Sequence, residues 1–300
     1  MTTNHVLTST RPDFITVSVV LRRTVSLLEL SRPHRHPNFR FCIIGLPSML
    51  AALQYHLLRL IAPRVPSTMS GEAYEGKSKL RILLPRIETQ IKDKVVLDFG
   101  CGPGLEVKEM AQLGAKRVIG LDIGEKWLQI GREKAEEAGV GAKCEFATSV
   151  SSPVEVIVSL DSFEHFADPG AVLQTMYSLL EPGGCVFISF GPTWYHPLGG
   201  HLFSVFPWAH IVLKEAALIR WRAQFKTDGA RKFGEVEGGL NQMTIRRFEE
   251  ILQTSQFIVE ELELVPIRRL KRLHDRLTRE FLTAIVRCKL RKPRDSAGAA

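Results

Sequence analysis

Three glycines at alternate positions follow a short apolar run that ends in an acid. The segment reads Val95-Val96-Leu97-Asp98-Phe99-Gly100-Cys101-Gly102-Pro103-Gly104. Because glycine has no Cβ, the backbone N–H groups of such a loop can approach a ligand closely. A strand that runs into a glycine loop is typical of the first part of a nucleotide-type site in an α/β sheet.

The spacing of these glycines argues against a dinucleotide site. The motif G-x-G-x-x-G, counted from Gly100, requires a glycine where the chain has Leu105. A second apolar run, at 118–121, ends in Asp122, and a carboxylate at that strand end can accept hydrogen bonds from both hydroxyls of a ribose. The alternative is a glycine turn that packs a helix on the sheet without a ligand. The two acids at the two strand ends disfavour it.

A histidine follows a third apolar run, at 154–160, within the segment Asp161-Ser162-Phe163-Glu164-His165. Histidine titrates near neutral pH, so His165 is our first candidate for a general base; the alternative is a residue that only packs or orients the loop. His196 and His201 are the next candidates. They lie five residues apart in a loop with no third ligand nearby in the sequence, so we expect no metal site.

Strand-like and helix-like segments alternate along the chain, which predicts a parallel, doubly wound α/β sheet. The expected strands are 95–99, 118–121, 143–146, 154–160 and 185–190, and the expected helices are 77–90, 106–113, 124–138 and 169–180. A helix at 244–254, a strand at 257–265, a basic helix at 268–279 and an alternating strand at 286–291 follow. Ligands of such sheets bind at the carboxyl ends of the strands, where the acids and His165 are expected to converge.

The glycine loop, Asp122 and the 161–165 segment with its following Asp168-Pro169 resemble the class I S-adenosylmethionine-dependent methyltransferases. The similarity is to the small-molecule enzymes of the ubiquinone and menaquinone-biosynthesis type and covers about residues 70–190. It implies a doubly wound, mostly parallel seven-stranded sheet, the Rossmann-like methyltransferase fold, with a helical insertion after strand five. It also implies S-adenosylmethionine as cofactor, held by Asp98, Gly100, Cys101, Gly102, Gly104, Asp122, Ile123 and Asp161.

One segment departs from the family pattern. Such proteins usually carry an acid after the third strand that meets the adenine amino group, whereas residues 146–153 contain none. Either backbone groups and hydroxyls such as Thr148 or Ser149 hold the adenine, or cofactor affinity is reduced. A non-catalytic relative that binds the cofactor therefore stays open as an alternative.

The segment 191–240 carries three of the four tryptophans, Trp194, Trp208 and Trp221. It is expected to form a lid over an apolar or aromatic acceptor, or an accessory cap with its own core; the two are compatible. The expected reaction is methyl transfer to an oxygen or carbon nucleophile of such a small molecule. Transfer of this kind depends chiefly on orienting the nucleophile and excluding water.

The net charge of +8 is concentrated at the two ends of the chain. Residues 1–66 carry +6 and residues 268–294 carry +9, whereas the centre is acidic. We expect residues 1–66 to be a poorly ordered basic segment containing an amphipathic helix at 48–62, and residues 67–300 to form the methyltransferase domain. That helix has Leu50, Leu53, Leu57, Leu58 and Ile61 on one side, and lies on a membrane or covers the core. Met49 and Met69 are candidate starts of a shorter chain.

Basic ends suit a membrane surface, a nucleic acid or plain solvation. A nucleic-acid methyltransferase is the second functional hypothesis, but Asp161 is not followed by the Pro-Pro-aromatic motif that resembles amino-methylating DNA enzymes, so no nucleic-acid partner is expected. The five cysteines have no C-x-x-C spacing, which indicates free thiols. Together with the lack of a secretory signal, this predicts a cytoplasmic protein, with peripheral membrane contact as an option.

Overall fold

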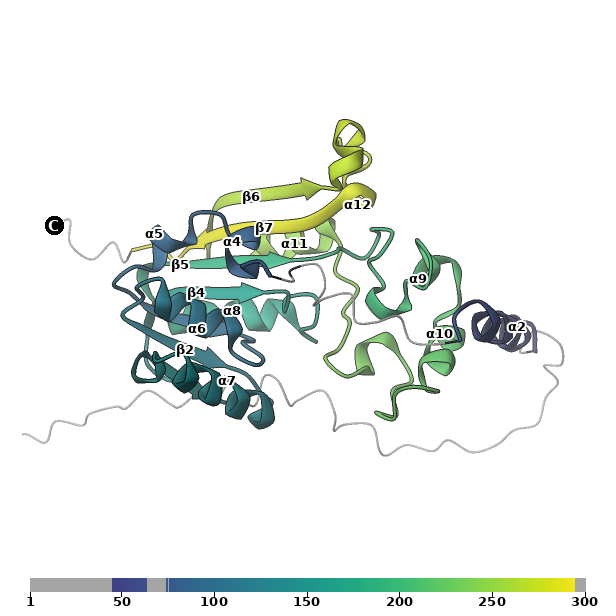
Figure 1. Cartoon of the computed structure of the whole chain (residues 1–300). Coiled ribbons are helices and arrows are strands. Elements are labelled where there is room, and N and C mark those ends of the chain that lie inside the picture. Colours follow the sequence, from purple (N-terminus) through teal and green to yellow (C-terminus); the bar gives the residue numbers. More distant parts are fainter. Residues whose placement is uncertain (1–44, 64–73, 75, 295–300) are drawn as a thin grey trace, which may run out of the picture.

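The computed structural model describes residues 45–63, 74 and 76–294 and contains a seven-stranded sheet (Figure 1). The strands are β1 Val95–Phe99, β2 Arg117–Leu121, β3 Cys144–Ala147, β4 Val154–Leu160, β5 Leu180–Phe190, β6 Ile258–Pro266 and β7 Thr283–Arg291. Their order is β3-β2-β1-β4-β5-β7-β6, and among these described strands β7 runs in the direction opposite to the other six. The predicted fold class, a mostly parallel α/β sheet, is confirmed.

Helices cover both faces of this sheet, because successive residues of a strand point to opposite sides. Val96 of β1 faces a core shared with α4 Lys79–Leu83, α5 Ile87–Ile91, α6 Leu105–Gln112 and α7 Glu125–Glu137. Leu97 faces the opposite core, shared with α8 Pro169–Leu179 and α11 Ile245–Thr254. Both strand residues are buried, which is why the central strands read as continuous apolar runs.

Two predicted helices are broken in the structure. The helix expected at 77–90 is divided into α4 and α5, because Pro85 lies between them and Arg86 adopts a left-handed φ of 67°. The basic helix expected at 268–279 is instead a 3-10 helix, η4 Arg268–Leu273, and a short α12 Arg279–Leu282. Between them the Asp275 carboxylate accepts hydrogen bonds from the N–H groups of Leu277 and Thr278, a turn that competes with helix.

The segment 191–240 forms a cap with its own small core. It contains α9 Ala209–Val212, α10 Glu215–Arg222 and the 3-10 turns η2 His201–Phe203 and η3 Phe233–Glu235; a further 3-10 turn, η1 Gly141–Lys143, precedes β3. Phe203, Trp221 and Phe233 are buried there. Figure 1 shows the cap beyond the carboxyl ends of the parallel strands, with helix α2 on its outer side.

Helix α2 Gly45–Ile61 lies close to the amphipathic helix expected at 48–62, and it packs on the cap through a side that contains only Leu58 of the predicted apolar residues. The buried side is formed by Leu58 with Ala51 and Tyr55, and the Gln54 side chain accepts a hydrogen bond from the Lys214 N–H at 2.8 Å. The other leucines of the predicted side are exposed. Because α2 is apolar nearly all round, periodicity could not identify which side packs. Residues 1–44, expected to be poorly ordered, lie outside the described residues.

None of the helices that the structure describes has both the length and the apolar character needed to cross a membrane.

Candidate functional site

The glycine loop joins β1 to α6 and is tied to β2 by hydrogen bonds. The N–H of Gly100 donates to the Leu121 carbonyl at 2.8 Å. Gly100 has φ 85°, and a Cβ placed on it would lie 2.8 Å from the Ser162 Oγ, so the loop packs against the segment that follows β4. At Gly102 a Cβ would meet nothing within 4 Å. The middle of the loop therefore borders open space.

Asp122, at the end of β2, binds both the glycine loop and the start of α7. Its Oδ2 accepts a hydrogen bond from the Gly102 N–H at 2.9 Å, and its Oδ1 accepts one from the Gly124 N–H at 2.8 Å. Each carboxylate oxygen has a second lone pair, so the group can still accept hydrogen bonds from a ligand. The side chain is half-buried, at the strand end where the sequence predicted a ribose site.

Asp98, near the end of β1, is a deeply buried acid. It is 3% exposed, and its Oδ2 has no hydrogen-bond partner among the described residues. Burial raises the pKa of Asp98 well above its usual value, and the negative charges of Glu106 and Asp122 raise it further. A buried polar atom without a partner is costly, so Asp98 is a natural acceptor for a donor group of a bound molecule.

Lys79 of α4 provides the positive charge of the site. Its Nζ lies 3.0 Å from the Asp161 Oδ2 and 3.9 Å from the Glu106 Oε1. Burial lowers the pKa of Lys79, but the two carboxylates outweigh burial and the net shift is upward. No motif in the sequence marked Lys79 or Glu106, because only the packing of α4 against α6 brings them to the loop.

Glu164 is a second buried acid, next to Asp161. It is 2% exposed, and neither carboxyl oxygen receives a hydrogen bond of normal geometry from the described residues. Burial first, and then the charge of Asp161, raises the pKa of Glu164 to about 8. Tyr74 lies near both acids, and burial followed by the charge of Asp161 raises its pKa to about 12. The site is thus rich in carboxyl groups, and a bound ligand that carries positive charge would favour their ionised form.

His165 and His201 lie together, with ring centroids 5.3 Å apart. The His165 Nδ1 is 2.7 Å from the Gly239 carbonyl, which can only accept, so Nδ1 carries a proton and the neutral ring keeps its lone pair on Nε2. Burial first, and then His165 and His210, lower the pKa of His201 to about 4. Its Nε2 has no partner in the described part of the chain.

His196 instead holds its own loop. Its Nδ1 accepts a hydrogen bond from the Leu198 N–H at 3.0 Å. Burial, followed by the charge of His210, lowers the pKa of His196 to about 4. His210 in turn bridges the Trp194 carbonyl, at 2.7 Å, and the Ser204 hydroxyl, at 3.1 Å. These two histidines organise the cap.

Asn241, at the end of the cap, forms hydrogen bonds with the segment that carries His165. Its Nδ2 donates to the carbonyls of Phe163 and Phe166, at 2.9 and 2.8 Å, and its N–H donates to the Glu164 carbonyl at 3.0 Å. Gly239, with φ 73°, passes so close that a Cβ would lie 2.7 Å from the His165 carbonyl oxygen. The position of His165 therefore depends on the cap as well as on β4.

The adenine side of the expected site is open and apolar. Ile123 and Trp127 are exposed beside Asp122, and sequence reasoning did not find Trp127. The hydroxyl residues Thr148 and Ser149 are exposed after β3. Cys101 is buried within the glycine loop, and burial raises the pKa of its thiol, so it is a neutral packing residue rather than a nucleophile.

A cavity of about 200 Å³ lies away from this site. It is lined by residues of α8 and α11 and of the segment that leads into β6, among them Tyr177, Ile251 and Phe257. None of the residues predicted for the site lines it. The predicted site residues at the carboxyl ends of β1, β2 and β4 are therefore separate from that cavity.

Solved structures with a similar chain trace include an S-adenosylmethionine-dependent methyltransferase from Mesorhizobium loti. That structure is 18% identical, with a TM-score of 0.46, over 71% of this chain and 95% of the other. The magnesium protoporphyrin IX methyltransferase of Synechocystis, solved with bound SAH, is 16% identical, with a TM-score of 0.47, over 82% of this chain and 98% of the other.

Curated relatives match a shorter stretch at higher identity. The ubiquinone biosynthesis O-methyltransferase of Bordetella avium is 36% identical over 105 residues, 33% of this chain and 43% of that protein. The enzyme of the same name from Serratia proteamaculans is 38% identical over 105 residues, again 33% and 43%. The match thus spans less than half the length of these relatives.

A family profile described as a methyltransferase domain matches residues 73–262, which is more than half of the chain. That range contains the glycine loop, Asp122, the 161–165 segment and the whole cap. The chain belongs to the class I S-adenosylmethionine-dependent methyltransferases.

Proposed function

We propose that this chain transfers the methyl group of S-adenosylmethionine to an oxygen nucleophile of an apolar or aromatic small molecule. The observation that carries the proposal is the hydrogen bond from His165 Nδ1 to the Gly239 carbonyl. It fixes a proton on Nδ1, so the base form of the ring has its lone pair on Nε2, in the segment that follows β4 and packs against the glycine loop. An oxygen nucleophile must lose a proton on methylation, and a neutral histidine can accept it.

The residues of the site fit the cofactor. Asp98 has an unpartnered buried oxygen, Gly102 borders open space, and Asp122 stands at the strand end that suits a ribose. Asp98 and the loop would hold the methionine part and Asp122 the ribose. Ile123 and Trp127 supply apolar surface for the adenine, which compensates for the missing acid after β3.

When bound, S-adenosylmethionine supplies a methyl group already activated by its sulfonium. The protein must therefore orient the nucleophile and exclude water, and orientation alone contributes roughly 7–11 kcal/mol to such reactions. The cap, whose end is bound to the His165 segment through Asn241, would lie over the site and shield it from water. The relatives named as ubiquinone O-methyltransferases support an aromatic hydroxyl acceptor.

The His165→Asn variant tests the role of the base. The amide Nδ2 can replace Nδ1 as donor to the Gly239 carbonyl, so the segment keeps its hydrogen bond while the lone pair at Nε2 is lost. We expect methyl transfer from labelled cofactor to a panel of hydroxylated aromatic compounds to fall roughly 10²–10⁴-fold, with cofactor affinity unchanged.

His196→Asn is the matched control. The amide oxygen can accept the Leu198 N–H in place of the ring Nδ1, so the cap loop is preserved and turnover is expected to stay close to that of the unchanged protein. Equal turnover in the two variants would remove His165 from the proposed reaction.

A further inference from the structure

A basic and apolar projection extends from the β6–β7 hairpin. We call residues 268–282, between these strands, the hairpin tip; it contains η4 and α12. Leu277 is 87% exposed and Leu273 is 60% exposed, and Phe281 is exposed as well. Soluble surfaces rarely present several large aliphatic side chains in so short a segment, and such groups mark interaction sites.

The charged residues of the hairpin tip are unequally engaged. Its two acids are occupied: Asp275 caps its own turn, and Glu280 accepts hydrogen bonds from the first N–H groups of α11. Arg279 forms a two-point ion pair with Glu249. The remaining cations are exposed and form no ion pair with any residue in the described ranges; they are Arg268, Arg269, Lys271, Arg272 and Arg276. The tip is thus a cationic surface interleaved with exposed leucines.

Contacts join the tip to further exposed apolar residues on the cap. The Phe281 ring lies 5.6 Å from that of Tyr195, whose carbonyl accepts a hydrogen bond from the Trp208 indole at 2.9 Å. Trp208 precedes α9, which exposes Ile211 and Val212.

The same surface continues from the cap to α2. The Lys214 N–H, just after α9, donates to the Gln54 side chain of α2. The exposed apolar residues of α2 are Met49, Leu50, Leu53, Leu57, Leu60 and Ile61, of which Leu60 is 79% exposed. Helix α2 carries no acidic residue.

These exposed residues lie at one end of the molecule. Figure 1 shows α2, α9, α12 and the hairpin tip beyond the carboxyl ends of the parallel strands, the end at which the candidate site opens. The opposite end, around the start of β6, exposes Ile258 and Val259 as its large apolar side chains in the described ranges.

We propose that the hairpin tip, together with the exposed faces of α9 and α2, docks this end of the protein on an anionic lipid bilayer. Aliphatic and aromatic side chains would enter the interface while the five cations bind lipid phosphates. A bilayer can bind both the cations and the exposed apolar side chains of this surface. A nucleic acid would bind the cations and leave the leucines in water. Docking in this orientation turns the candidate site toward the membrane, the phase in which an apolar methyl acceptor is concentrated.

Co-sedimentation of the full chain with vesicles tests the proposal. Vesicles of phosphatidylcholine with phosphatidylglycerol are expected to bind the protein, and vesicles of phosphatidylcholine alone are expected to bind it much more weakly. The triple variant Arg268→Gln/Arg269→Gln/Arg272→Gln should weaken binding roughly 100-fold, at about 1 kcal/mol for each basic residue at an anionic surface. The double variant Leu273→Asp/Leu277→Asp should weaken it at least about ten-fold, because both side chains leave the apolar phase.

Controls of equal charge separate docking from net charge. The triple variant Lys92→Gln/Lys116→Gln/Lys143→Gln removes the same charge from exposed positions at the other end, near the amino ends of β1, β2 and β3. It should bind anionic vesicles like the unchanged protein, and so should Ile258→Asp. The proposal is overturned if these controls lose as much vesicle binding as the tip variants do. It is also overturned if the tip variants bind anionic vesicles as well as the unchanged protein does.

Two other outcomes also contradict a bilayer. If single-stranded RNA binds in moderate salt and anionic vesicles do not, the cations serve a nucleic acid. If light scattering shows a dimer that Leu273→Asp/Leu277→Asp dissociates, and vesicles do not bind, the face is an interface between two copies. None of these readouts requires methyl transfer, so failure here is distinguishable from failure of the proposed reaction.

Discussion

The Asp122 carboxylate is the residue on which the geometry of the loop depends. One oxygen holds the Gly102 N–H and the other holds the Gly124 N–H, so the side chain fixes the loop and the start of α7 before any ligand arrives. The sequence predicted its place because the apolar run at 118–121 must end at the carboxyl edge of the sheet. It could not predict this double hydrogen bond, which depends on how the two loops approach each other.

Asp122→Asn tests this residue. One of the two oxygens becomes an NH₂ group that faces a backbone N–H, and the carboxylate charge for the ribose is lost. Hydrogen bonds to charged groups contribute about 1.5–3 kcal/mol, so we expect affinity for S-adenosylmethionine, measured by calorimetry, to fall roughly ten- to hundred-fold.

Asp168→Asn is the control for that change. Asp168 caps α8 by accepting the Ala171 N–H at 3.0 Å, and asparagine caps helices as well as aspartate does. Cofactor affinity should be unchanged in this control. Unaltered binding by Asp122→Asn would refute the ribose assignment. No binding at millimolar cofactor by the unchanged protein would refute the enzyme proposal.

Some features of the site could not be predicted from the sequence, and they concern Lys79, Glu106 and Glu164. The sequence placed Glu164 in the segment after β4, but it did not predict that the side chain is buried. Lys79 and Glu106 belong to two helices whose contact is made across the core. Spacing along the chain says nothing of such a contact, so the acids at strand ends were predictable and the lysine that pairs with Asp161 was not.

At the scale of elements, strands were easier to predict than the short helices around them. Buried strands read as apolar runs bounded by glycine or acids. The broken helices were missed because the charge and leucine pattern of 268–279 continues through the Asp275 turn, and because Pro85 was included within a helical period. In both places a local hydrogen bond or ring constraint outweighed the pattern.

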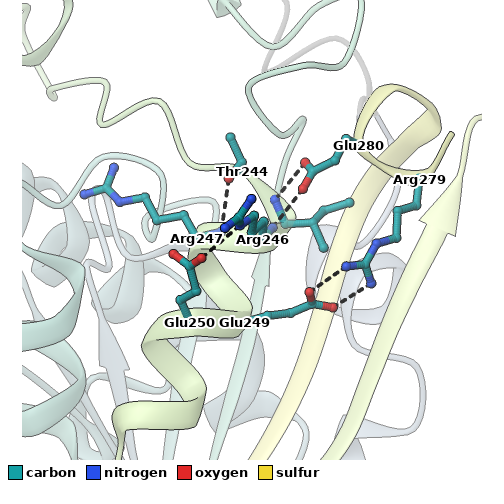
Figure 2. Close-up of polar contacts among 8 residues, drawn as sticks. Thr244, Arg246, Arg247, Glu249, Glu250, Arg279 and Glu280 are labelled. Carbon is teal, nitrogen blue, oxygen red and sulfur yellow. Dashed lines mark hydrogen bonds and ion pairs between the residues drawn. The ribbon is translucent and has the colours of Figure 1, made fainter. Parts of the chain in front are cut away.

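The N-terminus of helix α11 is capped by hydrogen bonds to side chains of two segments, one of which is the hairpin tip. Figure 2 shows the Glu280 carboxylate at the start of α11. Its oxygens accept hydrogen bonds from the N–H of Ile245 at 3.1 Å and from the N–H of Arg246 at 2.8 Å. The Thr244 hydroxyl accepts a third, from Arg247. A carboxylate at a helix N-terminus also interacts favourably with the helix dipole. The tip is therefore held on the folded domain.

Glu280→Ala removes two of these three hydrogen bonds. We expect the free energy of unfolding to fall by about 1–2 kcal/mol, as for the loss of a good helix cap, and the first amides of α11 to exchange hydrogen faster. Chemical denaturation and hydrogen exchange measure the two effects.

The matched control for that substitution is Glu250→Ala. Glu250 pairs with Arg246 on the exposed side of the same helix (Figure 2), and exposed ion pairs of this kind contribute about 0.3–0.5 kcal/mol. If the free energy of unfolding falls as much in this control as in Glu280→Ala, the hydrogen bonds of Glu280 at the start of α11 have no special role in stability.

At the scale of the whole molecule, buried ionisable groups of opposite kinds set how stability depends on pH. The pKa of Glu164 is about 8, above its ordinary 4.5, so the folded state holds a proton that the unfolded state has released between these values. Raising the pH through this range favours unfolding. His196 and His201 have pKa values of about 4, below their ordinary 6.5, so between these values lowering the pH favours unfolding.

The two effects oppose each other below pH 6.5, and of these three groups Glu164 alone titrates above it. We expect the free energy of unfolding of the unchanged protein to fall between pH 6.5 and 8, by on the order of 1–2 kcal/mol. Glu164→Gln, which has the same shape and no proton to lose, should show little change over that interval in urea denaturation at both pH values. Glu250→Gln, on the exposed side of α11, should retain the fall. If Glu164→Gln retains it as well, the Glu164 carboxyl is already ionised in the folded protein at pH 6.5.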